Sequence, residues 1–180
     1  MKHKARWVAG GVGVAVASLA VVLALNVGKD PRADATHSRL VGRPAPALTL
    51  PTLDGKEISP ASLAGKTVIV NFWNSWCQPC LQELPALQAY YAQHAADPDL
   101  LLVGIVRDDT ADAVRSAVRA SNIRWTIALD PGSKAALAYA TRGQPETYVI
   151  GPDGVIAASL YGPTTERSLD AMVAAARGKA

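Results

Sequence analysis

The apolar residues of the chain form short continuous runs that alternate with segments of helical spacing. Residues 68–73 and 100–106 are rich in β-branched, aliphatic and aromatic side chains and are too short for buried helices, so they predict two fully buried strands. Apolar residues recur at three- and four-residue steps from Cys77 to Tyr91, which predicts an amphipathic helix after the first strand. Further patterns predict strands at 126–129, 145–150 and 155–160, and helices at 111–120, 133–139 and 166–177. This alternation indicates an α/β domain with parallel strand pairing through crossover connections.

Two Asp-Gly pairs mark tight turns. The first separates the alternating segments 47–50 and 57–59 and predicts a β-hairpin near the start of the domain. The second, at 153–154, joins the last two predicted strands as an antiparallel pair. Residues 62–65 predict a turn that leads into the first buried strand.

The N-terminal part of the chain predicts a membrane anchor. Residues 1–6 contain three cations, and residues 7–27 contain no charge and are long enough to span a bilayer as a helix. The cations should remain in the cytoplasm while the rest of the chain is translocated. A cleaved signal peptide is the alternative, but the small-x-small sequence at 33–35 follows three charged residues and is a poor cleavage context. We therefore expect a retained transmembrane helix.

The remaining sequence predicts a linker and one domain. Residues 28–41 are polar and without periodicity, which predicts a flexible linker, and residues 42–180 form the domain. The net charge of +3 does not belong to this domain: residues 1–41 hold six Lys/Arg and two Asp/Glu, whereas residues 42–180 hold twelve and thirteen, a balance of −1. With no clustered basic face, the sequence argues against nucleic-acid binding.

The two cysteines stand where the first buried strand gives way to a helix. Cys77 and Cys80 are three residues apart on one helical turn, about 5–6 Å between Cα atoms, so they can form and open a disulfide without backbone movement. Cys77 would face the unpaired N–H groups of the helix end, which favour a thiolate, and is the predicted nucleophile. Cys80, a turn deeper, is the predicted resolving thiol. Pro79 is compatible with an early helical position, and neither it nor Gln78 carries a cation, which indicates a reductant more than a strong oxidant.

Two other interpretations of the cysteines are open. A structural zinc site needs two further thiolate or imidazole ligands, whereas the chain has no other cysteine and only three scattered histidines, so no metal and no cofactor is predicted. A purely structural disulfide would close a very small loop and would stabilise the fold weakly.

The motif around the cysteines resembles a known family. Residues 71–85 read N-F-W-x-S-W-C-x-P-C-x-x-E-x-P, which resembles the active site of the thioredoxin superfamily and, more narrowly, of its membrane-anchored TlpA-like and DsbE-like thiol–disulfide oxidoreductases. Pro85 matches the proline that kinks the first helix of that superfamily. The resemblance implies a thioredoxin-like fold, a central mixed sheet flanked by helices, with the N-terminal hairpin as an extension and one transmembrane helix before it. The chain departs from thioredoxin at Asn71, where thioredoxin carries a buried aspartate, and an amide cannot relay a proton.

The same resemblance extends to residues 143–148, which read G-Q-P-E-T-Y. This sequence is similar to the cis-proline loop of DsbE-like members, which faces the cysteine pair. It implies a cis peptide bond before Pro145, although most X–Pro bonds in folded proteins are trans. By analogy, the backbone of Gln144 would pair with an extended substrate segment.

Three further residues are candidates for the site. Glu83 lies three residues after Cys80 on the same helical face. If desolvated, it could take the proton of Cys80, a role that the resemblance to TlpA-like members with a glutamate at this position also implies. Alternatively, it could be a solvated residue that complements the helix dipole. Trp73 is expected in the core, and Trp76 is expected to offer an exposed apolar surface to a protein substrate. Glu146 is either a charge at a strand edge or a second carboxylate near the site.

Taken together, these features predict an extracytoplasmic disulfide reductase held at the cell membrane. The resemblance implies apocytochrome c as the protein substrate and a membrane thiol carrier as the source of reducing equivalents. A general extracytoplasmic disulfide reductase or isomerase fits the motifs equally well, and a non-catalytic binding module is a further alternative. A peroxidase would need a P-x-x-x-T-x-x-C motif, which the sequence lacks. A copper metallochaperone would need wider cysteine spacing and a partner histidine, and no histidine lies in a matching stretch after the cysteine pair.

Overall fold

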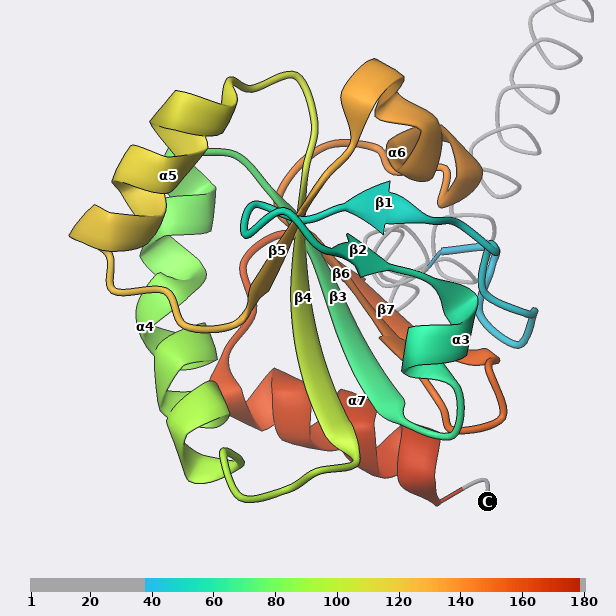
Figure 1. The fold of residues 1–180 in the computed structure, drawn as a ribbon. Helices are drawn as coiled ribbons and strands as arrows, with labels where there is room; N and C mark the ends of the chain where they lie inside the picture. Colours follow the sequence, from blue (N-terminus) through green and yellow to red (C-terminus); the bar gives the residue numbers. More distant parts are fainter. Residues whose placement is uncertain (1–37, 179–180) are drawn as a thin grey trace, which may run out of the picture. The chain divides into compact units, whose positions relative to one another are not determined.

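A five-stranded mixed sheet forms the centre of the domain in a computed structural model, which describes residues 38–178. The strand order is β5–β4–β3–β6–β7 (Figure 1). The strands are β3 (Thr67–Trp73), β4 (Leu100–Val106), β5 (Thr126–Leu129), β6 (Glu146–Ile150) and β7 (Ile156–Tyr161). Strands β3, β4 and β5 pair in parallel, whereas β6 pairs antiparallel with β3 and β7. The thioredoxin-like α/β fold and the parallel pairing are thereby confirmed.

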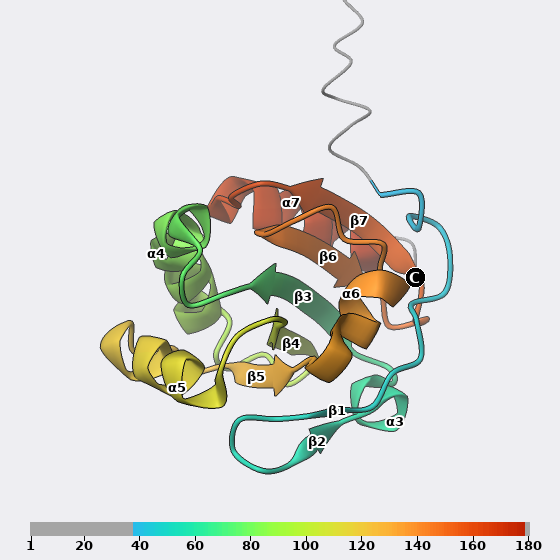
Figure 2. The ribbon, with the colours of Figure 1, turned by 90° about the horizontal axis from the view of Figure 1, so that it is seen from above.

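Helices cover both faces of this sheet. They are α3 (Pro60–Leu63), α4 (Gln78–Gln93), α5 (Ala111–Ala120), α6 (Lys134–Ala138) and α7 (Glu166–Arg177), with a 3₁₀ turn, η1, at Pro131–Ser133. Side chains of β3 alternate between two cores: Ile69 and Trp73 pack with residues of α4, α5 and α7, and Phe72 packs on the other face with Tyr139, which follows α6. Viewed from above, α4 and α5 lie on one side of the sheet, and α6 lies on the other with the hairpin (Figure 2).

Segments that precede β3 cover both edges of the sheet. The predicted hairpin is present as β1 (Leu50–Pro51) and β2 (Glu57–Ile58), which pair antiparallel. After β1, the Leu53 amide donates to the Ile127 carbonyl of edge strand β5 at 2.8 Å. At the opposite edge, the backbone of residues 42–45 pairs with residues 154–156. Neither edge therefore presents a full row of unpaired backbone groups.

The turn predicted at residues 62–65 is wrong in its first half, because the short helix α3 extends to Leu63. The sequence Ser59-Pro60-Ala61-Ser62 contains the reason. Pro60 occupies the first helical position, where no backbone donor is needed, and the Ser62 hydroxyl accepts the Ser59 amide at 2.9 Å. The helix predicted at 133–139 is also shorter than expected, because Ser133 belongs to η1 and Tyr139 is the C-cap residue.

The predicted cytoplasmic segment 1–6, the anchor at 7–27 and most of the linker at 28–41 lie outside the described residues. Over residues 38–178, no helix combines the length and the apolar character needed to cross a membrane. Residues 38–41, at the end of the predicted linker, contact the domain: the Ser38 amide donates to the Ser159 hydroxyl at 2.6 Å, and Leu40 and Val41 pack against the core shared with Phe72.

Candidate active site

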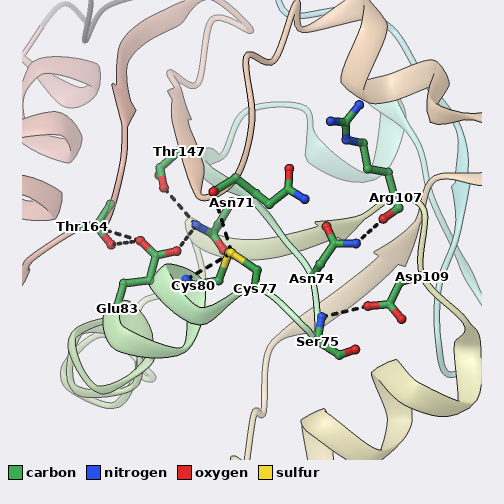
Figure 3. The surroundings of a disulfide bond; sticks show 11 residues. Asn71, Asn74, Ser75, Cys77, Cys80, Glu83, Arg107, Asp109, Thr147 and Thr164 are labelled. Atoms are coloured by element: carbon green, nitrogen blue, oxygen red, sulfur yellow. Dashed lines mark hydrogen bonds between the residues drawn. A yellow bond between two sulfur atoms is a disulfide. The ribbon is translucent and has the colours of Figure 1, made fainter.

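The two cysteines form a disulfide at the start of α4 (Figure 3). Cys77 is the N-cap residue and Cys80 is the third residue of the helix. Their Cα atoms lie 5.2 Å apart, and the Cys80 amide donates to the Cys77 sulfur at 3.3 Å. The bond that the spacing predicted is confirmed. The helix end supplies an N–H group to the sulfur predicted to ionise, which is how a helix N-terminus favours a thiolate.

The disulfide lies just beneath the surface. Cys77 is 4% exposed and Cys80 is 1% exposed. The residues on either side of Cys77 are exposed, namely Trp76, Gln78 and Pro79. A partner that contacts these neighbours would therefore meet Cys77 before Cys80, which is the order required of a nucleophile and a resolving thiol. These two roles remain predictions.

Glu83 is buried next to the disulfide rather than solvated (Figure 3). Its Oε1 accepts from Asn71 Nδ2 at 2.8 Å, and its Oε2 accepts from the Thr164 amide at 2.8 Å and the Thr164 hydroxyl at 3.0 Å. Burial raises the pKa of this carboxyl above its ordinary value, and these hydrogen bonds partly oppose the increase. The interpretation of Glu83 as a surface residue that complements the helix dipole is therefore wrong.

Asn71 supports Glu83 from the neighbouring strand. It is buried in β3, opposite Thr147 of β6, and its amide also donates to the Thr147 hydroxyl at 3.0 Å. The amide that stands where thioredoxin has an aspartate thus orients the carboxylate on α4 and does not itself exchange a proton.

The loop before β6 faces the cysteines, as the resemblance implied. The Gln144–Pro145 peptide bond is cis, which confirms that expectation. The Gln144 carbonyl oxygen lies 3.7 Å from Cys77 Sγ. A polypeptide joined to Cys77 through a mixed disulfide would therefore pass beside the backbone of Gln144. The binding of substrate by Gln144 and Pro145 remains a prediction.

The remaining residues considered from the sequence, Trp73, Trp76 and Glu146, differ in their exposure to solvent. Trp73 is buried in the core, and Trp76 is 59% exposed, so Trp76 has the accessibility that substrate contact requires. Glu146 is fully buried and pairs with the Arg142 guanidinium at 3.1 Å, while the Tyr148 hydroxyl donates to the same oxygen. It is therefore an ion-paired strand residue and not a second carboxylate open to the site.

Sequence reasoning missed three residues around the site: Thr147, Thr164 and Asp109. The two threonines complete the hydrogen bonds of Asn71 and Glu83, and Asp109 accepts the Ser75 amide at 2.8 Å. No local pattern identifies them, because each contacts a residue at least 34 positions away in sequence.

The domain matches the family model described as AhpC/TSA family over residues 41–159, which includes both cysteines, Glu83 and the cis-proline loop. The chain belongs to the AhpC/TSA family. It is 35% identical over 147 residues to the thiol:disulfide interchange protein CycY of Rhizobium leguminosarum bv. viciae, covering 80% of this chain and 74% of that protein. It is 29% identical over 130 residues to the thiol-disulfide oxidoreductase ResA of Bacillus anthracis, covering 72% of this chain and 75% of that protein.

A solved structure agrees with these relatives. The thiol:disulfide interchange protein of the thioredoxin family from Chlorobium tepidum TLS superposes with a TM-score of 0.67 at 28% identity, over 77% of this chain and 97% of that one. The AhpC/TSA member described here is thus one of the TlpA-like and DsbE-like proteins, and it is a thiol–disulfide oxidoreductase. The alternative of a non-catalytic binding module is thereby set aside.

Proposed function

We propose that this oxidoreductase works as a protein-disulfide reductase on the outer side of the cell membrane. One observation carries the proposal: the buried carboxylate of Glu83, fixed by Asn71 and Thr164, lies within the same helix as Cys80 and can take its proton when Cys80 attacks a mixed disulfide. A reductase needs this step, because its resolving thiol must become a thiolate while covered by substrate. The two residues between the cysteines, Gln78 and Pro79, carry no cation, and this favours the reducing direction over a strong oxidant.

The reaction follows from the order of the groups along α4. The Cys77 thiolate attacks a substrate disulfide, whose S–S bond breaks, and a mixed disulfide forms with release of one substrate thiolate. Cys80 then transfers its proton to the Glu83 carboxylate and attacks the Cys77 sulfur. The Cys77–Cys80 disulfide forms, and the second substrate thiolate leaves. The substrate gains two electrons and, with two protons, becomes a dithiol, while the protein becomes the disulfide seen in the structure.

The proposed substrate is the C-x-x-C-H cysteine pair of apocytochrome c before haem attachment, and the proposed electron donor is a membrane thiol carrier. The resemblance to DsbE-like proteins and the thiol:disulfide interchange activity named for CycY support this proposal. The backbone of Gln144 beside Cys77 suits an extended, unfolded segment, and the exposed Trp76 suits its apolar side chains. Residues 7–27 would anchor the protein with its domain outside the cytoplasm.

A trapping experiment tests the substrate. In a Cys80→Ser variant, Cys77 cannot be resolved, so mixed disulfides with the physiological partner accumulate and can be identified by mass spectrometry. Apocytochrome c among the trapped proteins supports the proposal. A broad set of unrelated exported proteins would favour the general reductase or isomerase instead. The Cys77→Ser, Cys80→Ser double variant is the matched control and should trap nothing.

A labelling experiment tests the location. In intact cells treated with a reductant, a membrane-impermeant thiol reagent should modify Cys77 of the full chain, and fractionation should recover the labelled protein with membranes. Protection of Cys77 until the cells are lysed would contradict an extracytoplasmic domain. Recovery of the full-length chain only in soluble extracts would contradict a retained anchor.

A further inference from the structure

The loop that leads into Cys77 is tied to a distant part of the chain. Residues 74–76 join the end of β3 to the N-cap of α4 and contain the exposed Trp76. The Asn74 side-chain amide donates to the Arg107 carbonyl, and the Ser75 amide donates to Asp109 Oδ2 at 2.8 Å (Figure 3). Both acceptors belong to the segment that follows β4. The position of Trp76 therefore depends on contacts outside its own element.

Asp109 uses both of its carboxylate oxygens. While Oδ2 accepts the Ser75 amide, Oδ1 accepts the Thr110 amide at 2.8 Å. Thr110 is the N-cap residue of α5, and its hydroxyl accepts the Ala113 amide at 3.2 Å. A single carboxylate thus connects the loop before Cys77 to the start of α5. Because an asparagine has only one side-chain oxygen, it could keep only one of these two bonds.

The segment that carries Asp109 is itself held in place. Asp108 has a φ of 53°, in the left-handed region that residues other than glycine seldom adopt. The Ser133 hydroxyl donates to Asp108 Oδ1 at 3.3 Å, and Arg107 Nε lies 3.9 Å from Asp108 Oδ2. The backbone turn at Asp108 is therefore supported by neighbours on both sides, and Asp109 follows directly from it.

We propose that Asp109 is a positioning residue for protein substrates. By holding the Ser75 amide, it fixes Trp76 beside Cys77 before a substrate arrives, so that little ordering of this surface is needed on binding. The inference rests on the proposed role of Trp76 in contacting protein substrates. Cys77 and Cys80 are held by α4 and not by Asp109, so loss of Asp109 should weaken substrate binding and leave the sulfur chemistry intact.

The test compares two substrates of the full chain in steady state, with dithiothreitol as reductant: insulin, a protein disulfide, and oxidised glutathione, a small one. Asp109→Ala should raise KM for insulin by about 3- to 10-fold, the range expected for ordering one side chain on binding, with kcat unchanged. Rates with oxidised glutathione should not change. Asp109→Asn should give an intermediate KM, and Asp112→Ala, an exposed acid on α5, is the matched control and should have no effect.

A double-mutant cycle identifies the residue through which Asp109 acts. In a Trp76→Ala background, Asp109→Ala should cause no further increase in KM for insulin. Additive effects, or equal losses with both substrates, would overturn the inference. If Trp76→Ala raises KM for insulin and Asp109→Ala does not, only the inference about Asp109 fails. If Trp76→Ala has no effect on this KM, the proposed role of Trp76 in substrate contact fails, and the inference about Asp109 fails with it. Should Asp109→Ala not fold by circular dichroism, Asp109→Asn is tested by the same comparisons.

Discussion

The hydrogen bonds of Glu83 indicate which of its oxygens can receive a proton. Each carboxylate oxygen offers two acceptor sites, and on Oε2 both are taken by Thr164, by its amide and its hydroxyl. On Oε1, Asn71 takes one site, and it is the only donor to this oxygen among residues 38–178. The proton released by Cys80 is therefore expected on Oε1. Thr164 and Asn71 hold the carboxyl plane so that this site keeps a fixed direction.

Glu83→Gln should slow the second chemical step and spare the first. A positioned general base contributes on the order of 10²-fold or more, so release of product from the mixed disulfide should slow by about 10²-fold, while alkylation of Cys77 in the reduced protein should be unchanged. In the parent protein, the rate at which Cys80 resolves the mixed disulfide should increase as pH rises through the raised pKa of Glu83. This pH-dependent increase should be absent from Glu83→Gln. Stopped-flow measurements from pH 4 to 8 would show it. Glu166→Gln, an exposed acid on α7, is the control, and equal resolution rates in parent and Glu83→Gln would exclude Glu83 from the mechanism.

The buried carboxyl should also make stability depend on pH. Because burial raises the pKa of Glu83 above the ordinary 4.5, the native protein keeps a proton that the unfolded chain has already released. The stabilisation that protonated Glu83 gives to the folded protein is complete below pH 4.5, and it is lost as pH rises through the higher native pKa. The free energy of unfolding of the parent relative to Glu83→Gln should therefore decrease between pH 4 and neutral pH. Urea denaturation at several pH values would measure this difference, and a constant difference would contradict it.

Residue spacing identifies residues of the site only where neighbours in sequence are also neighbours in space, whereas Gln144 and Pro145 were identified through the family resemblance. Cys77, Cys80 and Glu83 lie on one helix, so their three-residue spacing is enough to predict that they face together. The environment that buries Glu83 comes from β3 and from the segment before α7, which no spacing connects to α4. For this reason the choice between a buried base and a solvated acid needed the structure.

At the scale of elements, those that bury apolar residues are predicted well, and short exposed ones are predicted poorly. Strands β4 and β5 and helices α5 and α7 have the predicted limits, because each buries apolar residues. Helix α3 has no buried residue, so nothing in its hydrophobic pattern indicates it. The hairpin strands were expected from their turn, yet each has only two residues. On one side the turn begins with the bond from the Thr52 amide to the Lys56 carbonyl, and on the other side Ser59 already caps α3.

Gly104 in β4 is a position where element packing leaves no room for a side chain. A Cβ atom there would lie 2.7 Å from Trp73 Nε1 and 2.8 Å from Ile127 Cδ1, and both side chains are buried. Gly104→Ala should therefore lower the free energy of unfolding by about 1–3 kcal/mol, the usual cost of overpacking a core. Urea denaturation would measure it. Adding Ile127→Val, which removes the crowded Cδ1 atom, should cost less than the sum of the two single changes, and simple additivity would argue that the crowding is absent.

At the scale of the whole domain, only one of the two cores that flank the sheet contains residues of the predicted site. The core on the α4 face contains Cys77 and Cys80, whereas the core on the other face contains no residue of the predicted site. That second core is completed by residues before the hairpin, including Leu40 and Val41, beside the segment that pairs with the edge of β7. We therefore expect stability and redox chemistry to be separable by substitutions on this face.

The double change Leu40→Asp, Val41→Asp should make this separation measurable. Both side chains are partly buried against the second core, and placing two carboxylates there removes apolar contact and adds desolvation, at a cost of about 2 kcal/mol in the free energy of unfolding. Loosening this segment should also free the edge of β7, which would appear as faster limited proteolysis before residue 46. The rate of insulin reduction by the folded protein should remain that of the parent, because the disulfide belongs to the opposite core.

Arg39→Asp, an exposed position in the same segment, is the control for added negative charge. A parallel loss of activity at temperatures where the variant is folded would contradict the separation and would mean that the two faces are coupled through β3, the strand that contributes to both.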